Sequence, residues 1–192
     1  MQTFFETILI KNTEPLHLEY HQKRVDYTSN SLGFKPPILR DIIKKPNAKD
    51  LKCKVSYADR FYKVELMPLQ IREMSSLCLV VDDEIEYRYK SSQRDRLNRL
   101  YEKRGSCSDV LIIKNSLITD TTVANVAFFD GKRWLTPSSV LLKGTTRARL
   151  IESGFLQESK IELKMLHNFQ KIAVMNALIG FVELKKGIIF KK

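Results

Sequence analysis

The sequence predicts a protein of mixed helices and strands, of the α+β or α/β class, arranged in two domains. Strand-like runs of apolar residues alternate along the chain with stretches whose apolar residues recur at helical spacing. The chain has 192 residues, of which 43% are hydrophobic and 29% charged, and this balance is ordinary for a globular protein. We therefore expect a small α+β domain at residues 1–72 and a larger domain with a mixed sheet at residues 73–192.

The smaller domain is expected to begin with a strand followed by a helix. Phe4 and Ile8 favour a strand, and Asn12-Thr13 after them is a turn signal. The helix should end at Gly33, because glycine readily adopts the left-handed conformation that stops a helix. The elements expected in this domain are strands at residues 3–11, 51–58 and 61–66 and helices at residues 16–32 and 38–43.

The larger domain is expected to alternate short strands with helices. A helix at residues 91–104 places Leu97, Leu100 and Tyr101 on one face, and Gly105 stands after it as a cap. Asp130-Gly131 predicts a hairpin turn. The elements expected here are strands at residues 77–81, 109–114, 117–119, 124–129, 133–135, 156–161 and 172–175 and helices at residues 91–104, 145–153 and 162–169.

The net charge of +11 indicates an anionic partner. Nucleic acid and small anionic ligands both fit a basic chain. The basic residues are scattered from Lys11 to Lys192 with acidic residues among them, and the sequence has no zinc-finger or aromatic RNA-binding motif. We therefore expect a small anionic substrate and no nucleic acid.

We expect neither a membrane-spanning segment nor an export signal in this sequence. No apolar run approaches the ~20 residues that span a bilayer, and the first residues lack the basic start of a signal peptide. The three cysteines are odd in number and lack a zinc-ligand spacing, so Cys53 and Cys78, inside apolar runs, are expected to be buried thiols. These features favour a cytoplasmic protein with no membrane association.

Three features of the sequence suit a phosphate-bearing cofactor. Gly144 followed by two threonines at a helix start leaves backbone amides free for an anion. Lys90 lies between aromatic residues and an expected helix, where burial would free its amine for covalent chemistry with a carbonyl. Asp120 could pair with a protonated ring nitrogen. Each feature alone is more often structural, since threonines cap helices, most lysines are solvated and aspartate is common in turns.

The order of the motifs along the chain is more specific than any one of them. The motifs are Phe5-Glu6-Thr7, Leu16-His17 with His21 and Arg24, Lys90, Asp120 with Asn125, Phe128-Phe129-Asp130-Gly131, Thr136-Pro137, Leu142-Lys143-Gly144-Thr145-Thr146-Arg147 and Asn176-Ala177-Leu178. Their order resembles that of the class IV aminotransferases, the fold-type IV enzymes that use pyridoxal 5'-phosphate (PLP), and Asn176-Ala177-Leu178 is similar to a loop of the aminodeoxychorismate lyases. The resemblance implies a D-amino-acid aminotransferase-like architecture whose larger domain binds PLP.

The resemblance also assigns roles to individual residues. Lys90 would attach PLP and act as the acid–base group, and Asp120 would keep the pyridine nitrogen protonated. Arg24 would contact the phosphate with its planar fork. Arg94 and Arg147 are candidate anchors for an acidic substrate. The residues expected to bind the cofactor are Arg24, Lys90, Asp120, Asn125, Leu142, Gly144, Thr145, Thr146, Asn176 and Ala177.

The sequence departs from the family pattern at two points, and its histidine pair departs from the zinc-protease motif. The family usually has glutamate where this chain has Asp120, which is one methylene shorter. The chain also begins at the Phe-Glu-Thr strand, without the Gly-Asp-Gly approach that normally contributes substrate contacts. His17 and His21 stand four apart, as in a zinc protease, but Leu18 occupies the place of that motif's catalytic glutamate, so we expect no metal.

The shared cofactor machinery leaves the reaction open. We favour an aminodeoxychorismate lyase of folate biosynthesis, which would release 4-aminobenzoate and pyruvate, because the chain is compact and carries the Asn-Ala-Leu loop. The alternatives are an aminotransferase acting on branched-chain or D-amino acids and, more remotely, a non-catalytic member or a nucleic-acid-binding protein. The resemblance further implies a homodimer, and aminodeoxychorismate synthase would be the functional partner that supplies the substrate.

Overall fold

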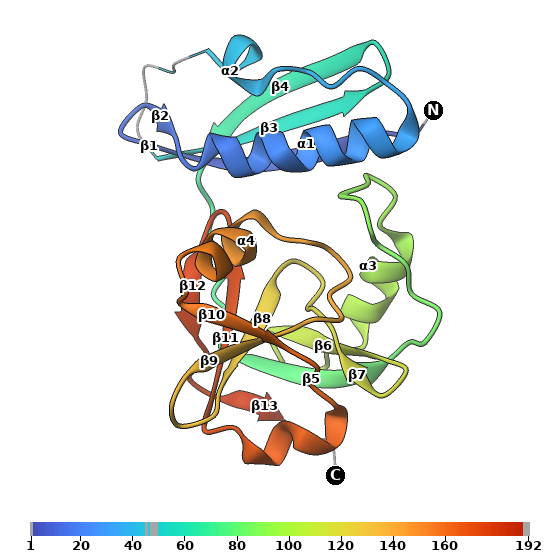
Figure 1. Ribbon diagram of the computed structural model, residues 1–192, viewed down its shortest axis with the longest axis vertical. Coiled ribbons are helices and arrows are strands. Elements are labelled where there is room, and N and C mark those ends of the chain that lie inside the picture. Colours follow the sequence, from blue (N-terminus) through green and yellow to red (C-terminus); the bar gives the residue numbers. More distant parts are fainter. Residues whose placement is uncertain (1, 45, 47–49, 190–192) are drawn as a thin grey trace. The chain divides into compact units, whose positions relative to one another are not determined.

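The computed structural model describes residues 2–44, 46 and 50–189. The chain divides into two compact units, and each is described by itself (Figure 1). The first unit comprises Met1–Ile71 and Tyr89–Gln93, and the second comprises Arg72–Arg88 and Arg94–Lys192. The short segment that contains Lys90 therefore groups with the first unit, although it is flanked in sequence by residues of the second.

The first unit is a four-stranded antiparallel sheet packed against a long helix. The strand order is β2-β1-β3-β4, with β1 (Phe4–Lys11), β2 (Glu14–Pro15), β3 (Leu51–Ala58) and β4 (Phe61–Pro68). The helices are α1 (Leu18–Leu32) and α2 (Leu39–Ile42). Val25 of α1 packs with Ile8 and Val55 of the sheet in the core of this unit. Alternate residues of β1 are buried, so Glu6 faces this core together with its apolar neighbours.

Most of the elements predicted for the first unit are confirmed. The strands at residues 3–11, 51–58 and 61–66 and the long helix are present, and Gly33 ends α1 with φ 77°. The helix begins at Leu18 rather than residue 16, because His17 adopts the left-handed conformation (φ 54°). The second helix has only four residues, 39–42, and is shorter than predicted.

The segment Tyr89–Gln93 lies beside the beginning of β1. The amide of Phe5 donates to the carbonyl of Lys90 (2.9 Å), and the amide of Ser92 donates to the carbonyl of Thr3 (2.9 Å). The predicted helix start at residue 91 is therefore wrong, because this backbone is already bonded to β1. The helix of this region is α3 (Asp95–Glu102).

The second unit contains two mixed sheets. The five-stranded sheet has the order β10-β9-β8-β11-β12, and the four-stranded sheet has the order β13-β5-β6-β7. Leu77 and Leu111 of the smaller sheet share one apolar core with Phe128 and Val174 of the larger. The strands are β5 (Ser76–Val81), β6 (Asp109–Lys114), β7 (Leu117–Ile118), β8 (Asn125–Phe129), β9 (Trp134–Pro137), β10 (Leu156–Ser159), β11 (Lys171–Asn176), β12 (Gly180–Glu183) and β13 (Gly187–Ile189).

In the described part of the second unit, helices are fewer than strands, and each helix is short. They are α3, α4 (Thr145–Glu152) and a 3-10 helix, η1 (Leu163–Asn168), which occupies the place of the helix predicted at residues 162–169. The predicted strands between residues 77 and 175 are confirmed with small shifts of their ends. Strands β12 and β13 had no counterpart in the prediction.

Two of the three cysteines form a disulfide, which corrects the expectation for Cys78. Parallel pairing of β5 with β6 places Cys78 opposite Val110 and near Cys107, and the two cysteines are bonded with their Cα atoms 5.8 Å apart. Cys53 is a buried free thiol, as predicted. Among residues 2–44, 46 and 50–189, no helix combines the length and apolar character needed to cross a bilayer.

Candidate active site

Arg24 is held by a buried carboxylate in the first unit. Its Nε and Nη2 donate to the two oxygens of Glu6, at 2.8 and 2.6 Å, and His21 Nδ1 lies 2.6 Å from Glu6 Oε2. Glu6 is fully buried. Burial alone would raise the pKa of Glu6, but the charge and hydrogen bonds of Arg24, with those of His21, outweigh it and lower the pKa to about 2. The guanidinium of Arg24 is therefore fixed in orientation by an ionised partner.

Lys90 occupies a defined, partly buried position in the same unit. Its backbone is bonded to β1, and its Nζ lies 4.7 Å from the centre of the Phe5 ring. Tyr89 beside it packs on Phe4 and Tyr27, with ring centres 6.1 and 5.9 Å apart. Lys90 is therefore partly buried, with its ammonium group over an aromatic face that attracts a cation.

Asp120 is a buried acid in the second unit, 3% exposed. Its Oδ2 accepts hydrogen bonds from the amides of Leu141 and Leu142, both at 2.9 Å, and its Oδ1 accepts one from Asn125 Nδ2 at 2.7 Å. Burial raises the pKa of Asp120 to about 6, although the hydrogen bonds from Leu142 and Asn125 and the charge of Arg147 work against this rise. A carboxylate has about four lone-pair positions, so these three donors leave Oδ1 able to accept a further N–H.

Asn125 and Gly144 fit closely against each other. Asn125 Nδ2 donates to the carbonyl of Leu142 at 2.9 Å as well as to Asp120. A Cβ at residue 144 would overlap Asn125 Oδ1, although the backbone of Gly144 is extended and acceptable to any residue (φ −72°, ψ 145°). Glycine is therefore required here for space, and the loop before α4 is tied directly to the acid.

The N-terminus of α4 is suited to an anion. Thr145 and Thr146 form its first turn and are buried, and Gly144 is its N-cap residue. The first amides of an α-helix lack carbonyl partners within the helix and carry the positive end of its dipole. Because the N-cap is a glycine, it has no side chain of its own to cover these amides. This end of α4 can therefore receive a phosphate group.

The two arginines suggested as substrate anchors are engaged in contacts within the second unit. Arg147, 5% exposed, donates to the carbonyl of Pro137 (2.8 Å) and to Glu158 (2.5 Å), which fastens α4 to β9 and β10. Arg94 donates to the hydroxyl of Tyr87 (3.0 Å) and to the carbonyl of Thr122 (2.7 Å). These bonds give both arginines a structural task, and substrate binding by either stays a prediction.

The Asn176-Ala177 loop is a tight turn between β11 and β12. Asn176 Oδ1 accepts hydrogen bonds from the amides of Leu178 (2.9 Å) and Ile179 (3.1 Å), and Gly180 completes the turn with φ 67°. Asn176 Nδ2 lies 3.3 Å from the carbonyl of Val123, in the turn that follows Asp120. The Asn176-Ala177 loop is thus joined to the turn that links Asp120 to Asn125.

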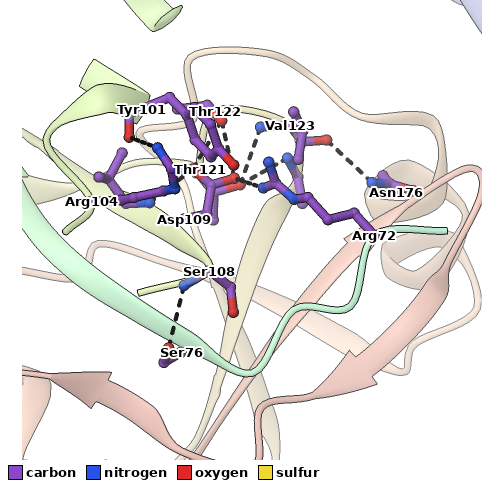
Figure 2. A network of polar contacts seen from close by, with 12 residues as sticks. Arg72, Ser76, Tyr101, Arg104, Ser108, Asp109, Thr121, Thr122, Val123 and Asn176 are labelled. Carbon is purple, nitrogen blue, oxygen red and sulfur yellow. Dashed lines mark hydrogen bonds and ion pairs between the residues drawn. The ribbon is translucent and has the colours of Figure 1, made fainter. Parts of the chain in front are cut away.

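Sequence reasoning missed the residues that support these loops. Figure 2 shows Asp109 at the centre of a polar network, with Arg72 and Thr122 directed at its carboxylate. None of these residues belongs to a recognisable motif. The available signal was weak: an acidic residue stands directly before four apolar residues at the start of a strand, and this position could have marked it.

The chain belongs to the class IV aminotransferase family, whose model matches residues 87–186. It is 31% identical over 187 residues to an uncharacterized protein of Haemophilus influenzae, a match that covers 94% of this chain and all of that protein. A crystal structure from Haemophilus somnus, provisionally named a 4-amino-4-deoxychorismate lyase, superposes with a TM-score of 0.87 at 28% identity and covers 94% of this chain and 98% of that one.

A more distant structure contains PLP. The PLP-bound form of a hypothetical aminotransferase from Mycobacterium tuberculosis superposes with a TM-score of 0.81 at 16% identity, covering 96% of this chain and 81% of that one. The fold is therefore the fold-type IV architecture that the sequence predicted.

Each unit contains residues of the kinds that PLP requires. The second unit offers a buried acid with acceptor capacity, an anion-accepting helix end and a glycine whose missing Cβ keeps the loop close to Asn125. The first unit offers the amine of Lys90 against an aromatic ring and an arginine fixed by Glu6. An aldehyde, a pyridine nitrogen and a phosphate require an amine, an acid and an anion site, respectively, and all three kinds of group are present.

Proposed function

We propose that this protein is a PLP-dependent 4-amino-4-deoxychorismate lyase, which releases 4-aminobenzoate and pyruvate. The observation that carries the proposal is the pairing, through Asn125, of the buried Asp120 with the Gly144 loop at the N-terminus of α4. The choice of the lyase is supported by the Haemophilus somnus structure described above. It is also supported by a Schizosaccharomyces pombe relative, provisionally named an aminodeoxychorismate lyase, which is 25% identical over 96% of this chain and 88% of its own length.

The chain's own residues would divide the work as follows. Lys90 would attach the cofactor and, once displaced by the amine of the substrate, take the proton from the carbon that carries this amine. Asp120 would hold a proton on the ring nitrogen, and the positive charge there would in turn favour the ionised carboxylate. The first turn of α4 would hold the phosphate, helped by the positive charge of Arg24, whose Nε and Nη2 are bonded to Glu6. PLP, when bound, supplies a ring that accepts the electron pair left behind by the proton.

Loss of this proton leads to different products in the two candidate reactions. In the lyase, the bond between the substrate ring and the enolpyruvyl oxygen breaks, the ring becomes aromatic as 4-aminobenzoate, and the three-carbon fragment takes up a proton and leaves as pyruvate. In an aminotransferase the proton returns at another carbon, and a keto acid is released. The aminotransferase remains the second candidate, because a structure from Mesorhizobium loti, provisionally named an amino-acid aminotransferase, covers 100% of both chains with a TM-score of 0.84.

The test is to incubate the purified chain, loaded with PLP, with aminodeoxychorismate and to measure 4-aminobenzoate by fluorescence and pyruvate by reduction to lactate. We expect equal amounts of both products, and Lys90→Ala should lower the rate by at least about a hundredfold. Lys63→Ala, which removes an exposed lysine of the first unit that pairs with Glu65, is the matched control. Transfer of amino groups from branched-chain or D-amino acids to 2-oxoglutarate, with no 4-aminobenzoate, would replace the lyase by the aminotransferase.

A further inference from the structure

The most unusual polar group outside the proposed roles is the carboxylate of Asp109. It lies at the first residue of β6 and is fully buried. Arg72 Nη2 donates to its Oδ2 at 2.7 Å, and the hydroxyl of Thr122 lies 2.9 Å from Oδ1 and 3.0 Å from Oδ2. The amide of Val110 donates to Oδ1 at 2.8 Å. A buried carboxylate costs several kcal/mol unless it is well paired, and the donors on Asp109 supply this pairing.

The network reaches the turn that joins the two cofactor residues of the second unit. Residues 121–124 connect Asp120 directly to Asn125. The turn is closed from within, because Thr121 Oγ1 accepts hydrogen bonds from the amides of Val123 (3.2 Å) and Ala124 (2.9 Å). It is held from outside at three successive points by Asp109, by Arg94 on the carbonyl of Thr122 and by Asn176 on the carbonyl of Val123.

We propose that Arg72, Asp109 and Thr122 form a positioning network for the PLP site, which fixes the turn at residues 121–124 and thereby the side chains of Asp120 and Asn125. Figure 2 shows Arg72 and Thr122 converging on Asp109 and Asn176 directed at Val123. This inference rests on the proposed use of PLP, and it is independent of whether the reaction is that of a lyase or of an aminotransferase.

The chemistry of the three side chains explains how the position is held. A hydroxyl has a single proton, and that of Thr122 is committed to Asp109 by the two short distances. Arg72 supplies the countercharge from a partly exposed site and stacks on the ring of Tyr101, with its guanidinium carbon 4.7 Å from the ring centre. The charged pair therefore anchors the hydroxyl, and the hydroxyl anchors the turn.

The test compares Thr122→Val, which has nearly the same shape but lacks the donor, with Thr122→Ser, which keeps it. PLP is titrated into the cofactor-free chain of 192 residues, and amide hydrogen exchange of residues 121–125 is measured in the same preparations. We expect Thr122→Val to raise the Kd for PLP about tenfold and to speed exchange in the turn, and Thr122→Ser to stay within about threefold of the wild type. Arg72→Gln, altered at the exposed end of the network, should act in the same direction.

The outcomes separate this inference from the proposed function. If Thr122→Val lowers the unfolding midpoint but binds PLP as tightly as the wild type, the network has a structural role only and the inference is wrong. The same holds if exchange of residues 121–125 is unchanged. If the wild-type chain itself fails to bind PLP, both proposals fall. If the wild type binds PLP but releases no 4-aminobenzoate, the lyase alone is rejected and the positioning role stands.

Discussion

At the scale of single residues, two buried carboxylates have pKa values shifted in opposite directions. Both are removed from water, which by itself raises the pKa. Glu6 has a cationic guanidinium on both oxygens, whereas Asp120 has uncharged amides and a carboxamide as donors. The charge of the hydrogen-bonding partner therefore decides whether the pKa of the buried carboxylate is lowered or raised. Glu6 is therefore a permanent anion that orients Arg24, and Asp120 remains responsive to a positive charge brought by a ligand.

The shift at Glu6 predicts a pH dependence of stability. Its pKa in the folded chain, about 2, lies below the ordinary value of 4.5, so its contribution is complete above pH 4.5 and is lost as the pH falls towards 2. The difference of about 2.5 units corresponds to about 3 kcal/mol. Glu6→Gln should lower the free energy of unfolding at pH 7 by about 3 kcal/mol or more, and the gap from the wild type should narrow below pH 4.5.

Urea unfolding at pH 7, 5, 4 and 3.5 measures this gap, and Glu65→Gln serves as the control. Glu65 forms an exposed pair with Lys63, so its replacement should leave the curves close to those of the wild type. A gap between Glu6→Gln and the wild type that stays constant across the series would show that the carboxylate is not ionised by its partners in the way the structure indicates.

At the scale of elements, the contact between Gly144 and Asn125 joins the start of α4 to the start of β8. Gly144→Ala should destabilise the protein by about 2 kcal/mol, because the added methyl group must displace a carboxamide that is bonded to Asp120 and Leu142. The backbone at Gly144 has negative φ, so the effect is one of space alone.

A double-mutant cycle separates crowding from other causes. Asn125→Ala removes the obstructing oxygen, so Gly144→Ala should cost much less in that background than in the wild type, with a coupling free energy of about 1 kcal/mol or more. Free energies of unfolding of the four proteins give this coupling. Simple additivity of the two substitutions would rule out the close contact as the reason for glycine at this position.

The elements also show which parts of the fold the sequence could predict. Strands such as β1 and β3 and the end of α1 at Gly33 follow from local patterns, and they are found where expected. The start of α3 was misjudged because Ser91 and Ser92 are bonded to β1, a partner about 90 residues away in sequence. Strand β13 depends in the same way on a distant neighbour, β5, that no local window contains. Strand β12 pairs with β11 across the tight turn that follows Asn176, so its absence from the prediction has no such long-range cause.

For the site, the sequence indicated the chemistry but not its support. The amine of Lys90, the acid at Asp120 and the Gly144 loop could be named because their residue types and order match a family pattern. Their supporting partners, such as Glu6 for Arg24 and Asp109 for Thr122, become visible only when the strands are paired. The sequence contains many carboxylates, and only the fold shows which of them pair with Arg24 and Thr122.

At the scale of the whole molecule, the cysteines connect the fold to the surroundings in which it is stable. The disulfide between Cys78 and Cys107 closes a loop with a sequence separation of 29 residues, and such a link contributes about 3.5 kcal/mol in the chain-entropy account. Burial raises the pKa of Cys53 to about 11, so this thiol is unreactive in the folded protein. We expect the denatured, unreduced chain to show one thiol by reaction with an aromatic disulfide, and the reduced chain to show three.

Reduction should then lower the free energy of unfolding by about 3.5 kcal/mol, and Cys107→Ser should reproduce this loss while Cys53→Ser should not change the effect of reductant. Thermal unfolding with and without reductant measures both. Three thiols in the unreduced, denatured chain would mean that Cys78 and Cys107 are thiols when the protein is isolated. If the stability depends on the disulfide, an oxidising compartment is favoured over the reducing cytoplasm that the odd number of cysteines suggested. If the stability is the same with and without reductant, the cytoplasm is favoured again, because a chain that folds equally well when reduced does not need the disulfide.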